Sequence, residues 1–215
     1  MTVYLPIMLD CHGQRCLVVG GGIIAQRKVE GLLEAGAAVT VVSPSLTSLL
    51  AELEKKDLLI WHNREFAPGD TRGAFLVYAA SNDHAVNLEV AGEARSLGIP
   101  VNVASQAEAG NFITPGVLRR GRLTVAVSTS GAGPGVTAGI RDLLAETLGE
   151  EYGPYLEFLH FMRTEIKRRE SSPEIRSRLL RKLGGLDVLN EMREGTFIEW
   201  DSESVDSWIA HHREE

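Results

Sequence analysis

Residues 15–28 read RCLVVGGGIIAQRK, and this stretch decides the fold. A short apolar run is followed by three glycines and then by helical periodicity, which predicts a strand, a tight turn and a helix. The spacing Gly20-x-Gly22-x-x-Ala25 matches the G-x-G-x-x-A dinucleotide-binding fingerprint. The first N–H groups of such a helix are unpaired and lie at the positive end of its dipole, so they favour a phosphate. The alternative is a glycine-rich turn that only packs the helix against the strand.

Each small residue of the fingerprint has its own physical role. Gly20 allows the tight turn, Gly22 lets a pyrophosphate approach bare backbone, and Ala25 lets the helix lie close to the strand. We therefore expect a bound nicotinamide dinucleotide. The residues expected to contact it follow three predicted strands and are Gly20, Gly21, Gly22, Ile23, Ile24, Ser43, Pro44, Ala80, Ser81 and Asn82.

Strand and helix patterns alternate through the first half of the chain. The predicted strands are 15–19, 38–42, 58–62, 74–79 and 99–103, and the predicted helices are 23–35, 46–55 and 83–97. Strands written as continuous apolar runs and separated by helices are typical of a parallel sheet covered on both faces. With right-handed crossovers, an α/β fold with a doubly wound, Rossmann-type sheet is the main option.

The pattern changes from about Asn111. Two strands, 112–118 and 123–128, are joined by a hairpin-like turn at residues 119–122, and a helix follows at 136–148. The chain is helical from Tyr152, with breaks near 171–173 and 184–185, and the acidic tail 199–215 is a short amphipathic helix or a frayed segment. We predict a dinucleotide-binding domain over 1–111, a small α+β dimerisation region over 112–149 and a helical domain over 150–215.

Composition excludes several classes of protein. The 215 residues carry a formal net charge of −7, which argues against non-specific nucleic-acid binding. No apolar run approaches the length of a membrane span, and residues 1–10 lack the pattern of a signal peptide, so we expect no membrane partner and a cytoplasmic protein. Cys11 and Cys16 are expected to be free thiols, and no further Cys or His pair accompanies them to form a metal site.

The end of the second strand usually carries Asp or Glu to bind the adenosine ribose. Here that position is Ser43, followed by Pro44 and Ser45. Hydroxyls can bind the ribose, but no carboxylate repels a 2′-phosphate and no arginine stands there to bind one. The choice between NAD and NADP therefore stays open at this position. A plain turn before the next helix is the alternative, and it is compatible with a cofactor role.

The segment Ala79–His84 follows the fourth strand and should face the crevice at the carboxyl edge of the sheet. The small residues there let a cofactor ring approach the backbone. Asp83 is a candidate for catalysis and equally for the N-cap of the next helix, and His84 is expected to face solvent. Asn102 ends the last parallel strand and should face the same crevice.

The run Ser128–Gly135 is rich in hydroxyls and glycines and leads into a helix. Exposed amides, hydroxyls and a helix N-terminus form an anion site. With Arg119, Arg120, Arg122 and Arg141 near it in sequence, the expected ligand is a polycarboxylate. The alternative is a flexible loop with a helix cap.

These motifs together resemble the precorrin-2 dehydrogenases, which stand alone or form the N-terminal module of bacterial sirohaem synthase. The resemblance spans residues 4–148 and is carried by Tyr4–Ile7, Cys16–Lys28, Ala79–Asp83 with Asn87, Val101–Val103, Phe112–Pro115 and Val125–Gly131. It implies NAD-dependent oxidation of precorrin-2 to sirohydrochlorin, which some members follow by inserting ferrous iron. It also implies a Rossmann domain, an intertwined dimerisation region and a C-terminal helical domain.

One departure from the family concerns catalysis. Members usually carry an aspartate just after the Asn-Val-x segment, where this chain has Ser105. Ser105 and Asp83 are our candidate catalytic residues, and we expect weak or no chelatase activity because a neutral hydroxyl is a poor base. The candidate substrate-binding residues are Asn102, Arg120, Ser128, Thr129, Ser130 and Gly131.

Partners and rival functions follow from the same residues. A homodimer is expected through residues 111–148, whose apolar residues the first domain alone does not cover, and a separate chelatase would take the product. One rival is a non-catalytic module that binds a dinucleotide or a tetrapyrrole. Another is an NAD-dependent reductase of a small acid, which the lack of an obvious Lys, His or Tyr dyad at the strand ends disfavours.

Overall fold

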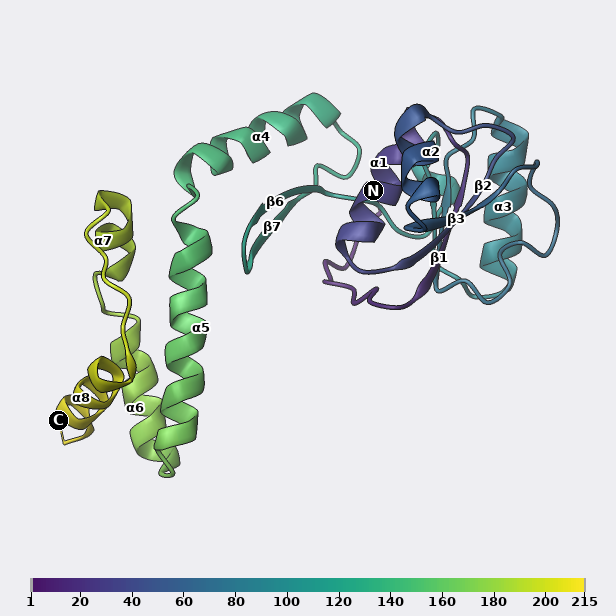
Figure 1. Ribbon diagram of the computed structural model, residues 1–215. Helices are drawn as coiled ribbons and strands as arrows, with labels where there is room; N and C mark the ends of the chain where they lie inside the picture. The colour runs from purple at the N-terminus through teal and green to yellow at the C-terminus, as the bar shows by residue number, and fades with distance from the viewer. Residues whose placement is uncertain (1, 215) are drawn as a thin grey trace. The chain divides into compact units, whose positions relative to one another are not determined.

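The computed structural model describes residues 2–214. It divides into two compact units, one ending at Thr114 and the other beginning at Pro115 (Figure 1). The first unit contains a five-stranded sheet in the order β3-β2-β1-β4-β5, with every neighbouring pair parallel. Its strands are β1 (Arg15–Val19), β2 (Ala38–Val42), β3 (Leu59–His62), β4 (Leu76–Ala79) and β5 (Val101–Val103).

Helices cover both faces of this sheet. They are α1 (Ile23–Glu34), α2 (Ser48–Lys55) and α3 (His84–Ser96), and a single 3-10 turn, η1 (Ala107–Ala109), follows β5. Alternate residues of β1 enter two separate cores: Cys16 and Val18 pack toward α1 and α2, whereas Leu17 and Val19 pack toward α3. The predicted doubly wound α/β architecture is confirmed.

Several predicted boundaries in this unit were wrong by one or two residues. Thr47 lies outside α2, because its hydroxyl accepts the N–H of Leu50 at 3.3 Å and so caps the helix. Strand β4 begins at Leu76 because Ala74 closes a turn onto the carbonyl of Thr71. Strand β5 begins after Pro100, which has no N–H to contribute to a ladder.

The second unit opens with an antiparallel hairpin of β6 (Gly116–Arg120) and β7 (Leu123–Val127). The strand predicted over 112–118 is therefore displaced toward the C-terminus, and Arg119 and Arg120 lie in the strand instead of the turn. The turn itself is Gly121 and Arg122, with Gly121 at φ +52°. Residues 112–115 are irregular because the carbonyl of Phe112 is bound by a side chain and Pro115 cannot donate.

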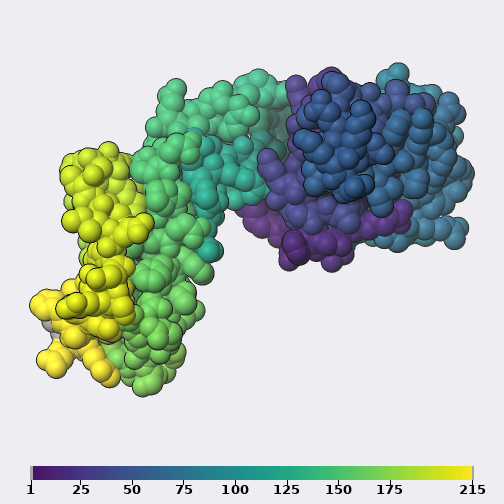
Figure 2. Space-filling view, in the orientation of Figure 1, coloured from purple at the N-terminus to yellow at the C-terminus, as the bar shows by residue number. Residues whose placement is uncertain are grey.

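Helix α4 (Pro134–Thr147) follows the hairpin and has no buried residue. Its residues are exposed or half-exposed, and Figure 2 shows atoms of this segment on the visible face. It begins at Pro134, two residues before the predicted start, because the first helical position needs no N–H. The hairpin is little better covered, since Leu118 is its one buried residue within the described chain.

The remaining helices share a core of their own. They are α5 (Tyr152–Arg169), α6 (Pro173–Leu183), α7 (Val188–Glu194) and α8 (Ser202–Arg213). Met162 and Ile166 of α5 and Leu179 of α6 are fully buried, and Ser172 caps α6 as its sequence indicates. The tail contains a helix, with Trp208 of α8 packed into the core, whereas Glu215 lies outside the described residues.

Two further observations concern the whole described chain. Cys11 and Cys16 are both buried free thiols, as predicted. Burial, together with the neighbouring Cys11, raises the pKa of Cys16 to about 12, so this thiol is unreactive near neutral pH. Within residues 2–214, no helix combines the length and the apolar character needed to cross a membrane.

Candidate functional site

The glycine turn between β1 and α1 is fixed by close contacts that leave no room for side chains. Gly20 has φ +122°, and a Cβ built there would lie 2.3 Å from the carbonyl oxygen of Ala80. A Cβ on Gly21 would lie 1.9 Å from the carbonyl oxygen of Ser45. Both distances are far below any real Cβ contact. The first two glycines therefore join the ends of β1, β2 and β4 into one edge.

Gly22 differs from its two neighbours. A Cβ at this position would meet no atom within 4 Å, and the backbone conformation is an ordinary extended one, with φ −84°. Gly22 is the N-cap of α1, and no side chain caps the helix or places a carboxylate in its first turn. The unpaired N–H groups at the start of α1 therefore face open space, which is the arrangement that binds a phosphate.

The residues around this helix start fit a bound dinucleotide. Ala25 is fully buried on the side of α1 that packs on the sheet, and its small side chain lets the helix lie close, as the fingerprint requires. Ile23 and Ile24 are 58% and 55% exposed, so two apolar side chains border the open face of the turn. The predicted cofactor contacts from Gly20 to Ile24 are thus contiguous in the structure.

Ser43 forms a turn, in agreement with the second of the two roles considered for this position. Its hydroxyl donates to the carbonyl of Ser45 at 2.8 Å, its carbonyl accepts the indole N–H of Trp61 at 2.9 Å, and the residue is buried. Pro44 and Ser45 are exposed beside it. Ser45 therefore presents its hydroxyl at this edge more openly than the predicted Ser43 does.

A basic residue missed at the sequence level lies close to this turn. Strand β3 pairs with β2, so the backbone N–H of Ser43 bonds the carbonyl of His62, and Arg64 follows two residues later. The Arg64 guanidinium forms two 2.7 Å hydrogen bonds with Asp70, which hold the pKa of that carboxyl below its ordinary value. Ser43 and Arg64 lie 21 positions apart in the sequence. Their proximity follows from the pairing of β2 with β3, which the sequence alone did not reveal.

The end of β4 supplies a small-residue wall. Ala79 and Ala80 are buried, and Ser81 and Asn82 lead outward to α3. Asp83 is the N-cap of α3: its Oδ1 accepts the N–H of Ala85 at 2.8 Å. His84 faces solvent, as predicted. The structural role proposed for Asp83 is therefore observed, and it leaves Oδ1 already hydrogen-bonded.

Asn87 of α3 connects two parts of the candidate site. Its side chain is 1% exposed and forms two 2.9 Å hydrogen bonds with the backbone N–H and carbonyl of Ser81. The same amide nitrogen lies 3.5 Å from the hydroxyl of Ser105. Asn87 thus holds the segments after β4 and β5 together. No role was predicted for it, although a buried amide one helical turn after an N-cap is a recognisable signal.

The Asn102 side chain hydrogen-bonds to the backbone instead of facing the open crevice, where it was predicted to lie. Its amide donates to the carbonyl of Phe112 at 2.9 Å. Nearby, the Tyr78 hydroxyl lies 3.2 Å from the Thr114 hydroxyl, and the Lys28 ammonium lies 5.2 Å from the centre of the Tyr78 ring. Burial lowers the pKa of Lys28 and raises the pKa of Tyr78. This Lys and Tyr pair was also missed at the sequence level, because the two lie 50 residues apart.

The predicted substrate loop belongs to the second unit. The Ser128 hydroxyl accepts the N–H of Ser130, and the Thr129 hydroxyl lies 2.9 Å from that of Thr137 on α4. Ser130 has φ +52°, a left-handed conformation that costs a non-glycine residue about 1–2 kcal/mol. Gly131 follows at φ +86°. The loop is therefore an ordered turn, and α4 begins after it without a side-chain cap.

The nearby arginines are engaged with protein groups. Arg120 pairs with Glu150 at 3.3 Å, Arg122 with Glu157 at 2.9 Å and Arg141 with Asp142 at 2.7 Å. Arg119 donates to Thr124. Arg120 is the most enclosed of the ion-paired three, with 17% of its side chain exposed. A carboxylate ligand would have to share these guanidinium groups with the carboxylates already present.

The first unit thus gathers most of the predicted site at one edge of its sheet. The glycine turn, the Ser43–Ser45 turn, Ala80–Asn82 and Ser105 all follow the carboxyl ends of neighbouring parallel strands. Arg120 and residues 128–131 belong to the other unit. Across residues 2–214, no cluster of three His, Cys, Asp or Glu side chains forms a metal-ligand set. The arrangement can bind a dinucleotide and present a small, largely neutral surface beside it.

Two family models match the chain. The model described as "Putative NAD(P)-binding" matches residues 7–116, and the model described as "Sirohaem biosynthesis protein central" matches residues 120–147. The first covers the unit that carries the glycine turn. The second covers most of the hairpin, the Ser128–Gly131 loop and α4.

Individual proteins are similar over most of the chain. The precorrin-2 dehydrogenase of Priestia megaterium is 37% identical over 177 residues, which are 82% of this chain and 87% of that protein. A siroheme synthase of Methylococcus capsulatus is 38% identical over 81% of this chain but only 36% of its own length. The chain therefore spans about a third of the siroheme synthases it matches. A solved structure of SirC, a precorrin-2 dehydrogenase, has a TM-score of 0.75 at 31% identity and covers 99% of this chain and 100% of its own.

Proposed function

This chain belongs to the precorrin-2 dehydrogenase family, and we propose that it catalyses the NAD-dependent oxidation of precorrin-2 to sirohydrochlorin in sirohaem biosynthesis. The observation that carries the proposal is the open backbone at Gly22, directly before the uncapped N-terminus of α1. Free thiols at Cys11 and Cys16 fit a reducing compartment, and we place the enzyme in the cytoplasm.

The residues present fit a nicotinamide dinucleotide. The N–H groups at the start of α1 would hold the pyrophosphate, and the exposed side chains of Ile23 and Ile24 would border it. Ala80, Ser81 and Asn82 would line the nicotinamide end, where small side chains permit close approach. When bound, this group supplies the hydride acceptor for the reaction.

We propose NAD in preference to NADP. A 2′-phosphate on the adenosine ribose would lie near the Ser43–Ser45 turn, where a free arginine is the usual partner. The arginine that β3 brings to this edge is Arg64, and both of its terminal nitrogens are bound by Asp70 at 2.7 Å. The exposed Ser45 hydroxyl and Pro44 suit a neutral ribose better than a phosphate.

The dehydrogenation removes a hydride and a proton from the substrate. The side chains of this chain that could accept the proton are weak bases. Ser105 is exposed and its hydroxyl lies near the Asn87 amide, and within residues 2–214 no carboxylate bonds this hydroxyl. Asp83 is a carboxylate, but its Oδ1 accepts two backbone N–H groups of α3. We therefore propose that catalysis depends mainly on holding the substrate carbon against the hydride acceptor. Ser105 would orient the substrate, and the Asp83 carboxylate, which directly follows the Ala80–Asn82 segment, would receive the proton.

The substrate is a tetrapyrrole with several carboxylates. Its anionic groups would bind the Ser128–Gly131 loop, the start of α4 and Arg120, while Asn102 supports the backbone beside the crevice. The left-handed Ser130 supports a binding role, because such strained positions cluster at ligand sites.

We also propose that residues 112–149 form a homodimer interface and that 150–215 form a helical domain of its own. The exposed fractions of Val136, Ile140 and Leu143 on α4 are 60%, 39% and 63%. Apolar surface of this density on a hairpin and one helix favours association with a second copy. Because Ser105 is a poor base, metal insertion would be weak, and the product would pass to a separate chelatase.

The test is a direct assay of the purified chain. Enzymatically made precorrin-2 and NAD are mixed with the protein under anaerobic conditions, and the absorption change to sirohydrochlorin is followed. NADP in place of NAD should give a much lower kcat/KM. Tight binding of NAD and of the tetrapyrrole without turnover would contradict the proposal and establish the rival function, a non-catalytic binding module.

A further inference from the structure

A groove outside the candidate site lies between α5 and α6. It has a volume of about 500 Å³, and its walls are Lys167, Pro173, Arg176, Ser177, Leu180 and Arg181. Lys167 belongs to the last turn of α5, and the other five occupy one face of α6 at helical spacing. The volume falls within the usual range for small-molecule sites. Three of the six lining side chains are cations and none is a carboxylate, although the chain as a whole carries −7.

The cations that line this groove lack the ion pairs that neighbouring cations of the described chain form. At the end of α5, Arg168 and Arg169 are both bound by Glu165 at 2.7 Å, whereas Lys167 between them has no ion pair among the described residues. Arg176 and Arg181 of α6 likewise have no carboxylate within ion-pair distance in the described part of the chain. The pKa of the Glu174 carboxyl is lowered by its hydrogen bond with Ser172 and, to a smaller extent, by the charge of Arg176. Elsewhere in this unit Arg120, Arg122, Arg193 and Arg213 each pair with a glutamate. The positive charge of the groove is therefore left for a ligand.

The lining is also partly apolar. Pro173 and the half-buried Leu180 lie between the cations and offer a surface without hydrogen-bonding groups. The Ser177 hydroxyl adds one polar contact on the same helix face. A ligand that fits this lining has several anionic oxygens and a compact apolar body.

We propose that the groove between α5 and α6 binds a multivalent organic anion, a molecule with at least two carboxylate groups on an apolar ring or chain. Lys167, Arg176 and Arg181 bind the carboxylates, and Pro173 and Leu180 contact the apolar body. The site is separate from the glycine turn. It does not depend on the proposed dehydrogenase activity.

The test is calorimetric titration of the full chain with benzene-1,3,5-tricarboxylate. We expect a dissociation constant of about 1 mM or below at low ionic strength, with affinity falling as salt is added. Propane-1,2,3-tricarboxylate, which has the same charge and no ring, should bind more weakly. Pyrophosphate tests the alternative source of anionic oxygens and should also bind more weakly.

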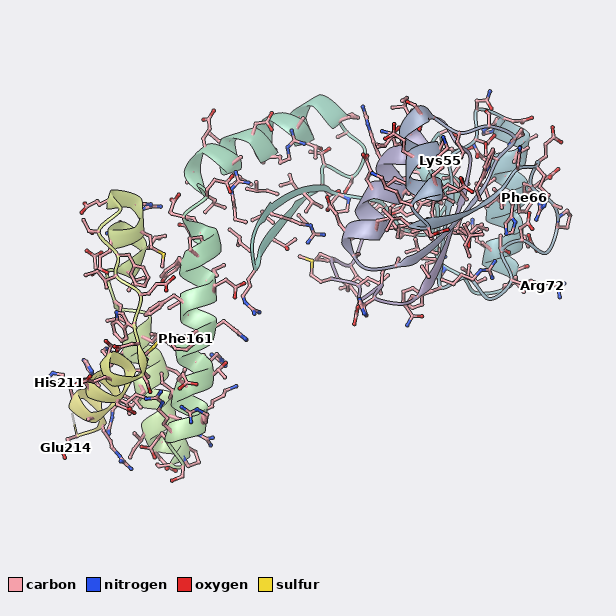
Figure 3. The ribbon with its side chains drawn as sticks, viewed as in Figure 1. Lys55, Phe66, Arg72, Phe161, His211 and Glu214 are labelled. Carbon is pink, nitrogen blue, oxygen red and sulfur yellow. The ribbon has the colours of Figure 1, made fainter. Side chains whose placement is uncertain are left out.

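Substitutions of the three lining cations test whether the tricarboxylate binds in this groove. Lys167→Gln, Arg176→Gln and Arg181→Gln each remove one charge while keeping most of the stem, and each should weaken binding about threefold to tenfold. The matched control is Arg72→Gln, an exposed arginine on the β3–β4 connection of the first unit, whose side chain is labelled in Figure 3. It should leave the affinity unchanged.

Three results would overturn the proposal. They are no heat of binding up to about 10 mM tricarboxylate, binding that the three groove substitutions leave unchanged, and pyrophosphate binding as tight as the ring compound. Turnover of precorrin-2 with NAD by the groove variants should equal that of the unmodified chain. A failure of the dehydrogenase assay would contradict the proposed function while leaving the titration intact.

Discussion

The parallel sheet of the first unit and the hairpin with α4 in the second unit both carry apolar residues but bury them very differently. Every residue of β4 is buried, and Cys16, Leu17 and Val18 of β1 have no exposed surface. In β6, β7 and α4, by contrast, Leu118 is the one buried residue among those described. The same kind of residue is thus covered by its own chain in one region and left open in the other.

This difference separates two sources of stability. The sheet is complete because α1 and α2 pack on one face and α3 on the other, so the sheet edge proposed to bind the cofactor is rigid without any partner. The hairpin and α4 leave Val117, Val136 and Leu143 in water. Burying such side chains contributes about 25 cal/mol per Å² of apolar surface. A second copy would supply that burial, so we expect the proposed substrate loop between β7 and α4 to depend on assembly.

The largest effect is expected at the rigid edge, from Gly22→Asp. The new carboxylate would occupy the position of the pyrophosphate at the start of α1, and NAD should bind at least about 100-fold more weakly. The fold should survive, because a Cβ on Gly22 meets no atom within 4 Å. Calorimetry with NAD measures the affinity, and circular dichroism checks the fold.

Gly31→Asp is the control for this substitution. It places the same charge later in α1, at an exposed position where a Cβ also meets nothing within 4 Å. NAD affinity should stay within about twofold. Equal NAD affinity in folded Gly22→Asp and unmodified protein would remove the assigned cofactor site.

The substitution Leu143→Asp on α4 tests the hairpin and α4, which leave apolar side chains exposed. Placing a charge on the helix face proposed to lie between two copies should raise the dimer dissociation constant by at least about 30-fold. Sedimentation velocity at micromolar concentration measures the change. Leu88→Asp on α3, a leucine 43% exposed in the first unit, should leave the dimer intact. A purely monomeric unmodified chain would contradict the interface.

The first unit was predictable because its signals are local. Each element is specified by a few neighbouring residues. Examples are the apolar runs, the glycine at position 36, which follows α1 with φ +71°, and caps such as Asp83. The misplaced strand at 112–118 shows where this fails. Its apolar start at Phe112 looks like a strand, but the Asn102 amide binds the Phe112 carbonyl and fixes an irregular segment. That contact spans ten residues and has no local pattern.

The site was predictable to a similar extent. Gly20, Gly21 and Gly22 could be placed because the fingerprint states its geometry in its spacing. The positions of Arg64 and Asn87 could not be predicted. Arg64 comes near Ser43 because His62, two residues before it, bonds Ser43 beside the paired strands β2 and β3, and Asn87 joins Ser81 to Ser105 through the interior. Such contacts depend on the order of strands, which the sequence implies only once the topology is known.

Asn87→Ala tests whether the edge owes its rigidity to this buried amide. The substitution removes two 2.9 Å hydrogen bonds and leaves the Ser81 backbone groups without their partner, which should cost about 2 kcal/mol of unfolding free energy. The kcat/KM for precorrin-2 should fall by about tenfold as the segments after β4 and β5 separate.

The control for Asn87 lies in the second unit. Asn190→Ala removes an exposed amide that bonds Asp187, and it should change the unfolding free energy by less than about 0.5 kcal/mol. Denaturant titration measures both variants. Equal stability of Asn87→Ala and the unmodified chain would show that the two segments are held by other contacts.

The smallest effect on dehydrogenation is expected from Ser105→Asp, which restores the carboxylate usual in the family. Ser105 is exposed and lies 3.5 Å from the Asn87 amide, so an aspartate there can stay ionised and hydrogen-bonded without disturbing the sheet. Hydride transfer depends on placing the substrate carbon, so kcat/KM for precorrin-2 oxidation should stay within about tenfold. Metal insertion needs a base for the pyrrole protons, and the variant should insert ferrous or cobaltous ion into sirohydrochlorin faster than the unmodified chain. Ser105→Ala, which adds no base, should leave chelation at the rate of the no-enzyme control under the same anaerobic conditions. If the unmodified chain already inserts metal well above that control, a carboxylate at residue 105 is not what chelation requires.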